Sequence, residues 1–383
     1  MDTTPLYDLQ PLARLMLLGI AVALLPLAWV WWRHRHGSVG QRLQALTWVT
    51  LFLTFDLVLF GAFTRLTDSG LGCPDWPGCY GAASPVGAHA DIAAAQQAMP
   101  TGPVTFPKAW IEMIHRYLAT GVGVLIIVLL VGSWVERRRL KVSLMWPVLT
   151  LIWVCVQGAF GALTVTMKLF PAIVTLHLLG GLALLALLRV QSVAYAPAAQ
   201  SPPLPGRAHR WLWLVFALVW LQVALGGWVS TNYAVLACTD FPTCQGRWWP
   251  PMDWSGFSVW RDLGHTAAGD PLPFAALTAI HYTHRLAAYV VLAALVFAAL
   301  LLRRQPGWRT ESHWLLALSA LQLLTGLSNV VLGWPLLAAV MHTGGAAALV
   351  LVLTGALARR HFEYAAMADQ LAAPIPRFSA QTS

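Results

Sequence analysis

The sequence predicts an all-α polytopic membrane protein with two parallel four-helix bundles and one extra N-terminal transmembrane helix. The chain has 383 residues, of which 58% are hydrophobic and only 10% are charged, whereas soluble domains carry about 25% charged residues. Apolar runs of about 20 residues recur along the whole chain, as expected for helices that cross a bilayer. Residue patterns of the first half also return about 165 residues later.

Nine spans are expected from the apolar runs, at about 12–32, 43–65, 110–134, 144–166, 171–190, 211–231, 278–302, 313–333 and 336–358. Most of the 24 Lys and Arg residues follow the first, third, fifth, seventh and ninth spans. Such alternate basic connections are typically cytoplasmic. This predicts an outside N-terminus, a cytoplasmic C-terminus and two long outer loops, at about 66–109 and 232–277. The first ten residues contain no Lys or Arg, which favours a true first helix over a cleavable signal peptide.

The predicted domain organisation follows from these spans and from a Pro-rich segment between the halves. We expect an extra transmembrane helix at 1–36, a first bundle at 37–195, a cytoplasmic linker at 196–210, a second bundle at 211–360 and a cytoplasmic tail at 361–383. The net charge of +9 comes from basic residues in short connections, so it indicates topology and a lipid bilayer, with no nucleic acid.

The two halves share polar, Cys and Gly residues at matched positions. The matches pair Cys73 and Cys79 with Cys238 and Cys244, Gln157 and Gly161 with Gln322 and Gly326, His115-Arg116 with His284-Arg285, His177 with His342, and approximately Asp56 with Gln222. Both bundles are predicted to begin on the cytoplasmic side. The duplication is therefore parallel, with a pseudo-two-fold axis along the membrane normal.

Each predicted bundle contains two histidines within apolar spans. His115 and His177 lie one or two turns inside the outer ends of spans three and five, and His284 and His342 repeat this placement. Two imidazoles facing each other across a four-helix bundle can hold haem iron from both sides. Haem is favoured because no third metal ligand is evident and because Gly residues near His177 and His342 leave room for a porphyrin. A copper or zinc site and a proton relay are the alternatives.

Charged groups flank these histidines. Glu112 shares a helix face with His115, and His281 stands at the aligned position of the second half. The difference predicts two sites with different roles, although a carboxylate that complements the helix dipole is a competing explanation for Glu112. Arg65, Arg116 and Arg285 lie at outer span ends. They could pair with haem propionates or simply extend to the interface.

Five residues separate the two cysteines of each outer loop (Cys-x5-Cys), Cys73 with Cys79 and Cys238 with Cys244. An oxidising outer compartment favours one disulfide in each loop. The spacing does not match a thioredoxin-like motif or a zinc ribbon. A structural role, in which each bridge fixes a loop over a haem site, is therefore favoured over a redox relay.

The ordered set of motifs resembles the haem A synthase family over about residues 43 to 360. The set comprises Glu112-Met-Ile-His115-Arg116, the Gly70–Cys79 loop and its copy at 238–244, and the histidines at 177, 284 and 342. The resemblance implies oxidation of the C8 methyl of haem O to a formyl group, giving haem A for terminal oxidases in the bacterial inner membrane. It implies that His115 and His177 hold the substrate haem, that His284 and His342 hold an electron-transferring haem b, and that Glu112 is the catalytic carboxylate.

Partners and competing functions follow from the same residues. The resemblance implies a complex with the farnesyltransferase that makes haem O (haem O synthase), and a homo-oligomer is a further candidate. A two-haem electron carrier would account for all four histidines, but not for Glu112 opposite His281. A haem exporter or chaperone would account for the Trp-rich loops without catalysis. A membrane disulfide oxidoreductase would account for the cysteines alone.

Overall fold

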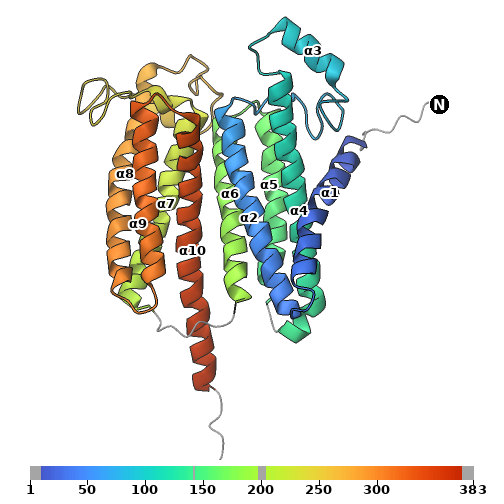
Figure 1. The fold of residues 1–383 in the computed structure, drawn as a ribbon. Coiled ribbons are helices and arrows are strands. Elements are labelled where there is room, and N and C mark those ends of the chain that lie inside the picture. Colours follow the sequence, from blue (N-terminus) through green and yellow to red (C-terminus); the bar gives the residue numbers. More distant parts are fainter. Residues whose placement is uncertain (1–9, 141–142, 197–203, 373–383) are drawn as a thin grey trace, which may run out of the picture.

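The computed structural model describes residues 10–140, 143–196 and 204–372, with side chains at all but Leu140 and 363–372 (Figure 1). Within them the chain is helical and contains no named strand. The α-helices are α1 (Gln10–Arg33), α2 (Val39–Leu66), α3 (His89–Ala98), α4 (Phe106–Leu140), α5 (Met145–Thr166), α6 (Pro171–Ala194), α7 (Gly206–Thr231), α8 (Phe274–Arg303), α9 (Arg309–Val331) and α10 (Leu336–Ala372). Two 3-10 helices, η1 (Ala234–Leu236) and η2 (Trp254–Phe257), lie between α7 and α8.

In the described part of the chain, nine helices are long and apolar enough to cross a membrane, namely all the α-helices except α3. This confirms the predicted polytopic helical class and the number of spans. Helix ends follow local signals. A capping box formed by Ser38 and Gln41 begins α2, and Pro171 occupies the first turn of α6, where its missing N–H removes no helical hydrogen bond.

The spanning helices form two sets beside each other (Figure 1). The first set is α2, α4, α5 and α6, with α1 packed against α4, and the second set is α7, α8, α9 and α10. The sets meet where α10 contacts α2 and α6, and where α6 contacts α7. Fully buried leucines such as Leu185, Leu188 and Leu295 belong to one apolar core that extends through both sets. Each set can therefore present polar side chains toward its own interior.

The two long connections, 67–105 and 232–273, lie at the same end of the helices, which we call the loop face (Figure 1). The first connection carries α3 and the second carries η1 and η2. The predicted linker at 196–210 overlaps residues 197–203, which lie outside the described residues, and α7 begins within it at Gly206. The predicted tail begins inside α10, which continues to Ala372, and its residues 373–383 lie outside the described residues. The orientation in the membrane stays a prediction.

Candidate functional site

The four predicted histidines lie inside the two helix sets, one pair in each. His284 of α8 and His342 of α10 face each other with ring centroids 6.5 Å apart and ring planes at 82°. Metal–imidazole bonds are about 2 Å long, so two rings on opposite sides of one metal have centroids roughly 6 Å apart. In the first set, His115 of α4 and His177 of α6 are both half-buried. The second pair therefore has a spacing that suits one iron held between two imidazoles.

A glycine on a neighbouring helix lies against each of these histidine rings. A Cβ added at Gly61, Gly161, Gly226 or Gly326 would lie 3.1, 3.4, 2.9 or 3.2 Å from Cε1 of His115, His177, His284 or His342, respectively. Gly61 and Gly226 are 165 residues apart, as are Gly161 and Gly326. Larger residues would press on the Cε1 edge of each imidazole, so the four glycines leave the space that the rings occupy.

Glutamine side chains anchor the backbone of three of the histidines. Gln157 and Gln322, both predicted from the repeat, donate to the carbonyls of His177 and His342 at 2.8 and 2.9 Å. Gln222 of α7 donates to the carbonyl of His284 at 3.1 Å. Asp56, which the sequence aligned approximately with Gln222, is exposed on the surface of α2. The residue 165 positions before Gln222 is Leu57, so the first set has no counterpart of Gln222.

Glu112 lies one turn from His115 toward the loop face and is buried, with 4% of its surface exposed. Its Oε2 accepts a hydrogen bond from the backbone N–H of Cys73 at 2.8 Å, and its Oε1 forms a salt bridge with Arg116. Arg116 also donates to the carbonyls of Asp75, at 3.0 Å, and Gly78. The carboxylate and guanidinium therefore bind the disulfide loop to α4 directly beside a histidine of the first pair.

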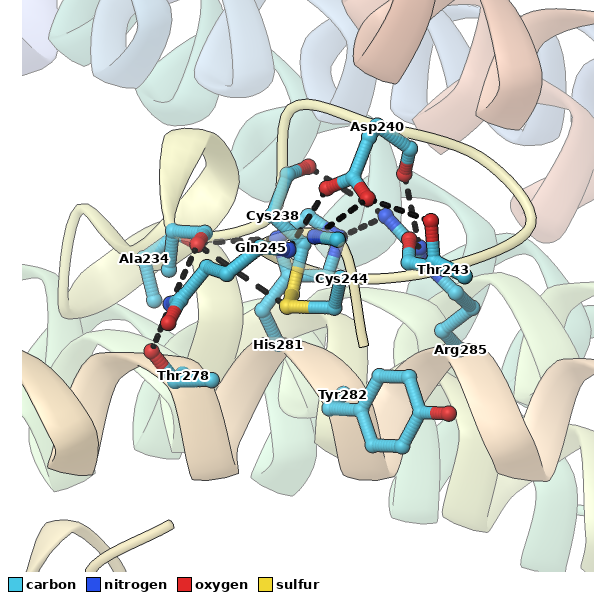
Figure 2. Close-up of a disulfide and its surroundings, with 12 residues drawn as sticks. Ala234, Cys238, Asp240, Thr243, Cys244, Gln245, Thr278, His281, Tyr282 and Arg285 are labelled. Carbon is cyan, nitrogen blue, oxygen red and sulfur yellow. Dashed lines mark hydrogen bonds between the residues drawn. A yellow bond between two sulfur atoms is a disulfide. The ribbon is translucent and has the colours of Figure 1, made fainter. Parts of the chain in front are cut away.

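The second set repeats this arrangement with an imidazole in place of the carboxylate (Figure 2). Arg285 donates to the carbonyls of Asp240 at 2.9 Å and Thr243 at 2.7 Å. Nε2 of His281 lies 3.4 Å from Arg285 Nη2, and its Nδ1 lies 3.0 Å from the carbonyl of Ala234. Since His281 is also buried, the Glu112-to-His281 difference places a carboxyl group in one set and a hydrogen-bonding imidazole ring in the other.

Both predicted cysteine pairs are at disulfide distance, Cys73 with Cys79 and Cys238 with Cys244. Each loop contains an Asp that accepts hydrogen bonds from backbone N–H groups just past the second cysteine, Asp75 from Tyr80 and Asp240 from Gln245. Hydrogen bonds from Thr243 and from the backbone of Gly246 and Gln245 lower the pKa of the exposed Asp240 carboxyl to about 2. The bridges thus close two matching turns over the ends of the helix sets.

Arg65 lies at the junction of the two sets. Its guanidinium lies over the ring of Tyr233, 3.9 Å from the centroid, and donates to the carbonyl of Ser230. The Tyr233 hydroxyl donates to Asp68 at 2.6 Å. Asp68 and Tyr233 are separated by 165 residues and both have a left-handed backbone, so repeat-related positions contact each other across the junction. A role of Arg65, Arg116 and Arg285 toward haem propionates stays a prediction.

The donor set fits two haem irons better than a protein-caged metal. Across the described residues, no three His, Cys, Asp or Glu side chains cluster as metal ligands. Each set instead supplies two imidazoles, and a glycine lies against the Cε1 edge of each ring. The Nδ1 atom of His115 is buried without a hydrogen-bond partner. Gly61, Gly226 and Thr325 were not predicted as site residues, because a Gly or Thr in an apolar span is usual for helix packing alone. Only their spacing from the histidines in the repeat could have revealed them.

The fold and these residues define a class: a polytopic membrane protein in which each of two helix sets holds a histidine pair beneath a disulfide-closed loop. Comparison with known proteins specifies the family. The model of the COX15-CtaA family, described as cytochrome oxidase assembly proteins, matches residues 44–354. The chain belongs to this family.

Named relatives agree with this assignment. Heme A synthase of Shewanella oneidensis is 38% identical over 315 residues, which cover 80% of this chain and 94% of that protein. Heme A synthases of Sphingopyxis alaskensis and Halalkalibacterium halodurans are 30% and 27% identical, over 85% and 75% of this chain and 92% and 86% of those proteins. The resemblance to the haem A synthase family, and the expectation of a membrane oxidoreductase, are confirmed.

Proposed function

We propose that this chain oxidises the C8 methyl group of haem O to a formyl group, which gives haem A. His115 and His177 hold the substrate in the first set, and His284 and His342 hold a haem b in the second set. The observation that carries the proposal is the repeated histidine pair with a single substituted neighbour, Glu112 in one set and His281 in the other. The relatives are named Heme A synthase, which supports haem A as the product.

The residues of the second set suit a bound haem b. The ring separation of His284 and His342 matches two ligands of one iron, and Gly226 and Gly326 leave both rings room. Haem b would supply one-electron transfer, for which a bis-imidazole haem has no need of an open iron position. His284 and His342 would hold and orient the haem, and the surrounding apolar side chains would keep water away from it.

Glu112 is the residue proposed to act on protons. With water as the oxygen source, conversion of a methyl group to a formyl group releases four protons and four electrons. The electrons would leave one at a time through haem b to an external one-electron acceptor, and the protons need an acceptor beside the substrate. Glu112 is buried, lies one turn from His115 and is held by Arg116 and the Cys73 N–H. These fixed donors keep the carboxylate oriented, while His281 at the matching position binds a loop carbonyl instead.

The substitution Glu112→Gln tests this function. Glutamine keeps the size of the side chain and an acceptor for the Cys73 N–H, but removes the charge. We expect purified E112Q to retain haem b and to accumulate haem O without haem A, measured by extracting and separating the haems. The control is Glu136→Gln on the same helix, because Glu136 pairs with Arg139 at the far end of α4. Haem A production by E112Q equal to that of E136Q would remove Glu112 from the mechanism.

The cellular setting is part of the same proposal. A multi-pass protein whose relatives are bacterial heme A synthases would reside in the bacterial inner membrane, with the loop face outside. Haem O reaches the first set from the farnesyltransferase that makes it, in a complex of the two enzymes. Association of copies of this chain is a further element of the proposal.

A further inference from the structure

The Nδ1 atoms of the four histidines have different surroundings in the two sets. In the second set, Nδ1 of His342 lies 2.9 Å from the hydroxyl oxygen of Thr325. That hydroxyl donates its own proton to the carbonyl of Leu321 at 2.7 Å, so toward His342 it acts as an acceptor. The Nδ1 atom of His342 therefore carries the proton, and Nε2 is left free for a metal.

His284 has a different neighbour at Nδ1. The amide nitrogen of Gln222 lies 3.0 Å from this ring nitrogen and donates to the carbonyl of His284 at 3.1 Å. Gln157 makes the same pair of contacts with His177. An amide nitrogen is only a donor, so Gln222 supplies no acceptor, and Thr325 is the residue that distinguishes the second set.

The first set has no such acceptor at either histidine. Nδ1 of His115 is buried and unpartnered, and Leu57 stands where the repeat places Gln222, four residues before the glycine that backs the ring. Nδ1 of His177 has only a 3.4 Å contact with Gln157, whose amide nitrogen already donates to the His177 carbonyl at 2.8 Å. Phe160 replaces Thr325 at the position before the backing glycine.

This difference has a known physical consequence. An acceptor on the second nitrogen of a ligating imidazole fixes its tautomer and orientation and strengthens its donation to the metal, and loss of such a partner costs about 10- to 100-fold in metal affinity. A bond from Thr325 to the carbonyl four residues back is common for Thr in helices and does not require the contact with His342. That additional contact is confined to the second set.

We propose that Thr325 is a positioning residue that makes the haem of the second set permanent. Phe160 at the matching position leaves His177 without such an acceptor, so that the first set can accept haem O and release haem A. The inference rests on the proposed function, which assigns the cofactor to one set and the substrate to the other. It adds a residue that decides which site exchanges its haem.

The test measures haem release and haem potential in purified chains carrying Thr325→Val. We expect haem b to pass to excess apomyoglobin about 10- to 100-fold faster than in the unaltered chain. The midpoint potential of haem b should rise, because weaker imidazole donation favours the ferrous state. The matched control is Thr343→Val, which removes a hydroxyl beside His342 that bonds to the backbone carbonyl of Ala339.

The reciprocal variant tests the first set. Phe160→Thr introduces the missing acceptor, and it should slow release of haem O and haem A to apomyoglobin while haem b release is unchanged. Release of haem b from T325V at the rate of T343V, with an unchanged potential, would overturn the inference. Haem release and potential are measured without turnover, so a chain that makes no haem A but shows these shifts refutes the proposed function alone.

Discussion

The glycine behind His284 offers the sharpest test of the geometry of the second set. In Gly226→Ala the new Cβ would lie 2.9 Å from Cε1 of His284, whereas ordinary contacts begin at 3.4 Å. The imidazole of His284 must therefore move away from residue 226 by about 0.5 Å. That is a large displacement for a ring that, in the proposed function, shares a metal with His342. Overpacking of this kind costs typically 1–3 kcal/mol, equivalent to a loss of roughly 5- to 100-fold in haem b affinity.

Substitutions at the other glycines should have smaller effects on haem binding. The corresponding Cβ contacts are 3.2 Å at Gly326 and 3.4 Å at Gly161, so Gly326→Ala should be milder than Gly226→Ala, and Gly161→Ala should leave its site nearly intact. Gly158→Ala is the control, because nothing lies within 4 Å of its added Cβ and alanine stabilises a helix interior by about 0.5–1 kcal/mol. The assay is haem b per purified chain, by extraction and absorption. Full haem b content in G226A, equal to that of G158A, would refute the assignment of His284 as a ligand.

Three further predictions concern the loop face. Replacing Cys238 and Cys244 together by Ser should lower the free energy of unfolding by about 2 kcal/mol, from the entropy of a short closed loop, and thermal unfolding that is unchanged in detergent would contradict this. Because the pKa of Asp240 is lowered to about 2, its stabilisation of the second loop is present above about pH 4 and lost as the pH falls toward 2. Reduction of the Cys238–Cys244 bridge by a phosphine should accelerate across that range, and in Asp240→Asn it should be fast and independent of pH. Tyr233→Phe should lower the free energy of unfolding by about 1 kcal/mol, because the hydrogen bond to Asp68 is lost. Tyr289→Phe on α8 should leave it unchanged.

The sequence predicted the features that depend on local pattern. Apolar length identified the spans, and repetition identified the histidine pairs, Gln157 with Gln322, and the cysteine pairs. The sequence repeat alone did not fix the register of α2. It matches Asp56 approximately to Gln222, whereas the residue 165 positions before Gln222 is Leu57. One residue turns a side chain by about 100° around a helix, and Asp56 accordingly lies on the outer surface.

The contacts of the arginines depend on tertiary structure. Arg116 and Arg285 were predicted from their position at span ends, where propionates or the interface were the expected partners. In the structure both guanidiniums bind carbonyls of the disulfide loops. No local pattern specifies such a contact, because the two bonded partners are 41 and 45 residues apart along the chain. The sequence also did not identify the glycines that contact the histidine rings, because each of these rings lies on another helix.

The identity of the haems in the purified chain tests the central claim most directly. The chain should be purified from cells that make haem O, and its haems extracted and separated. Our account predicts haem b together with haem O, its hydroxymethyl form or haem A. In Glu112→Gln it predicts haem b and haem O without the two oxidised forms. Haem b alone, in an amount that fills both histidine pairs, would contradict the account and favour an electron carrier. A chain without any haem would contradict both.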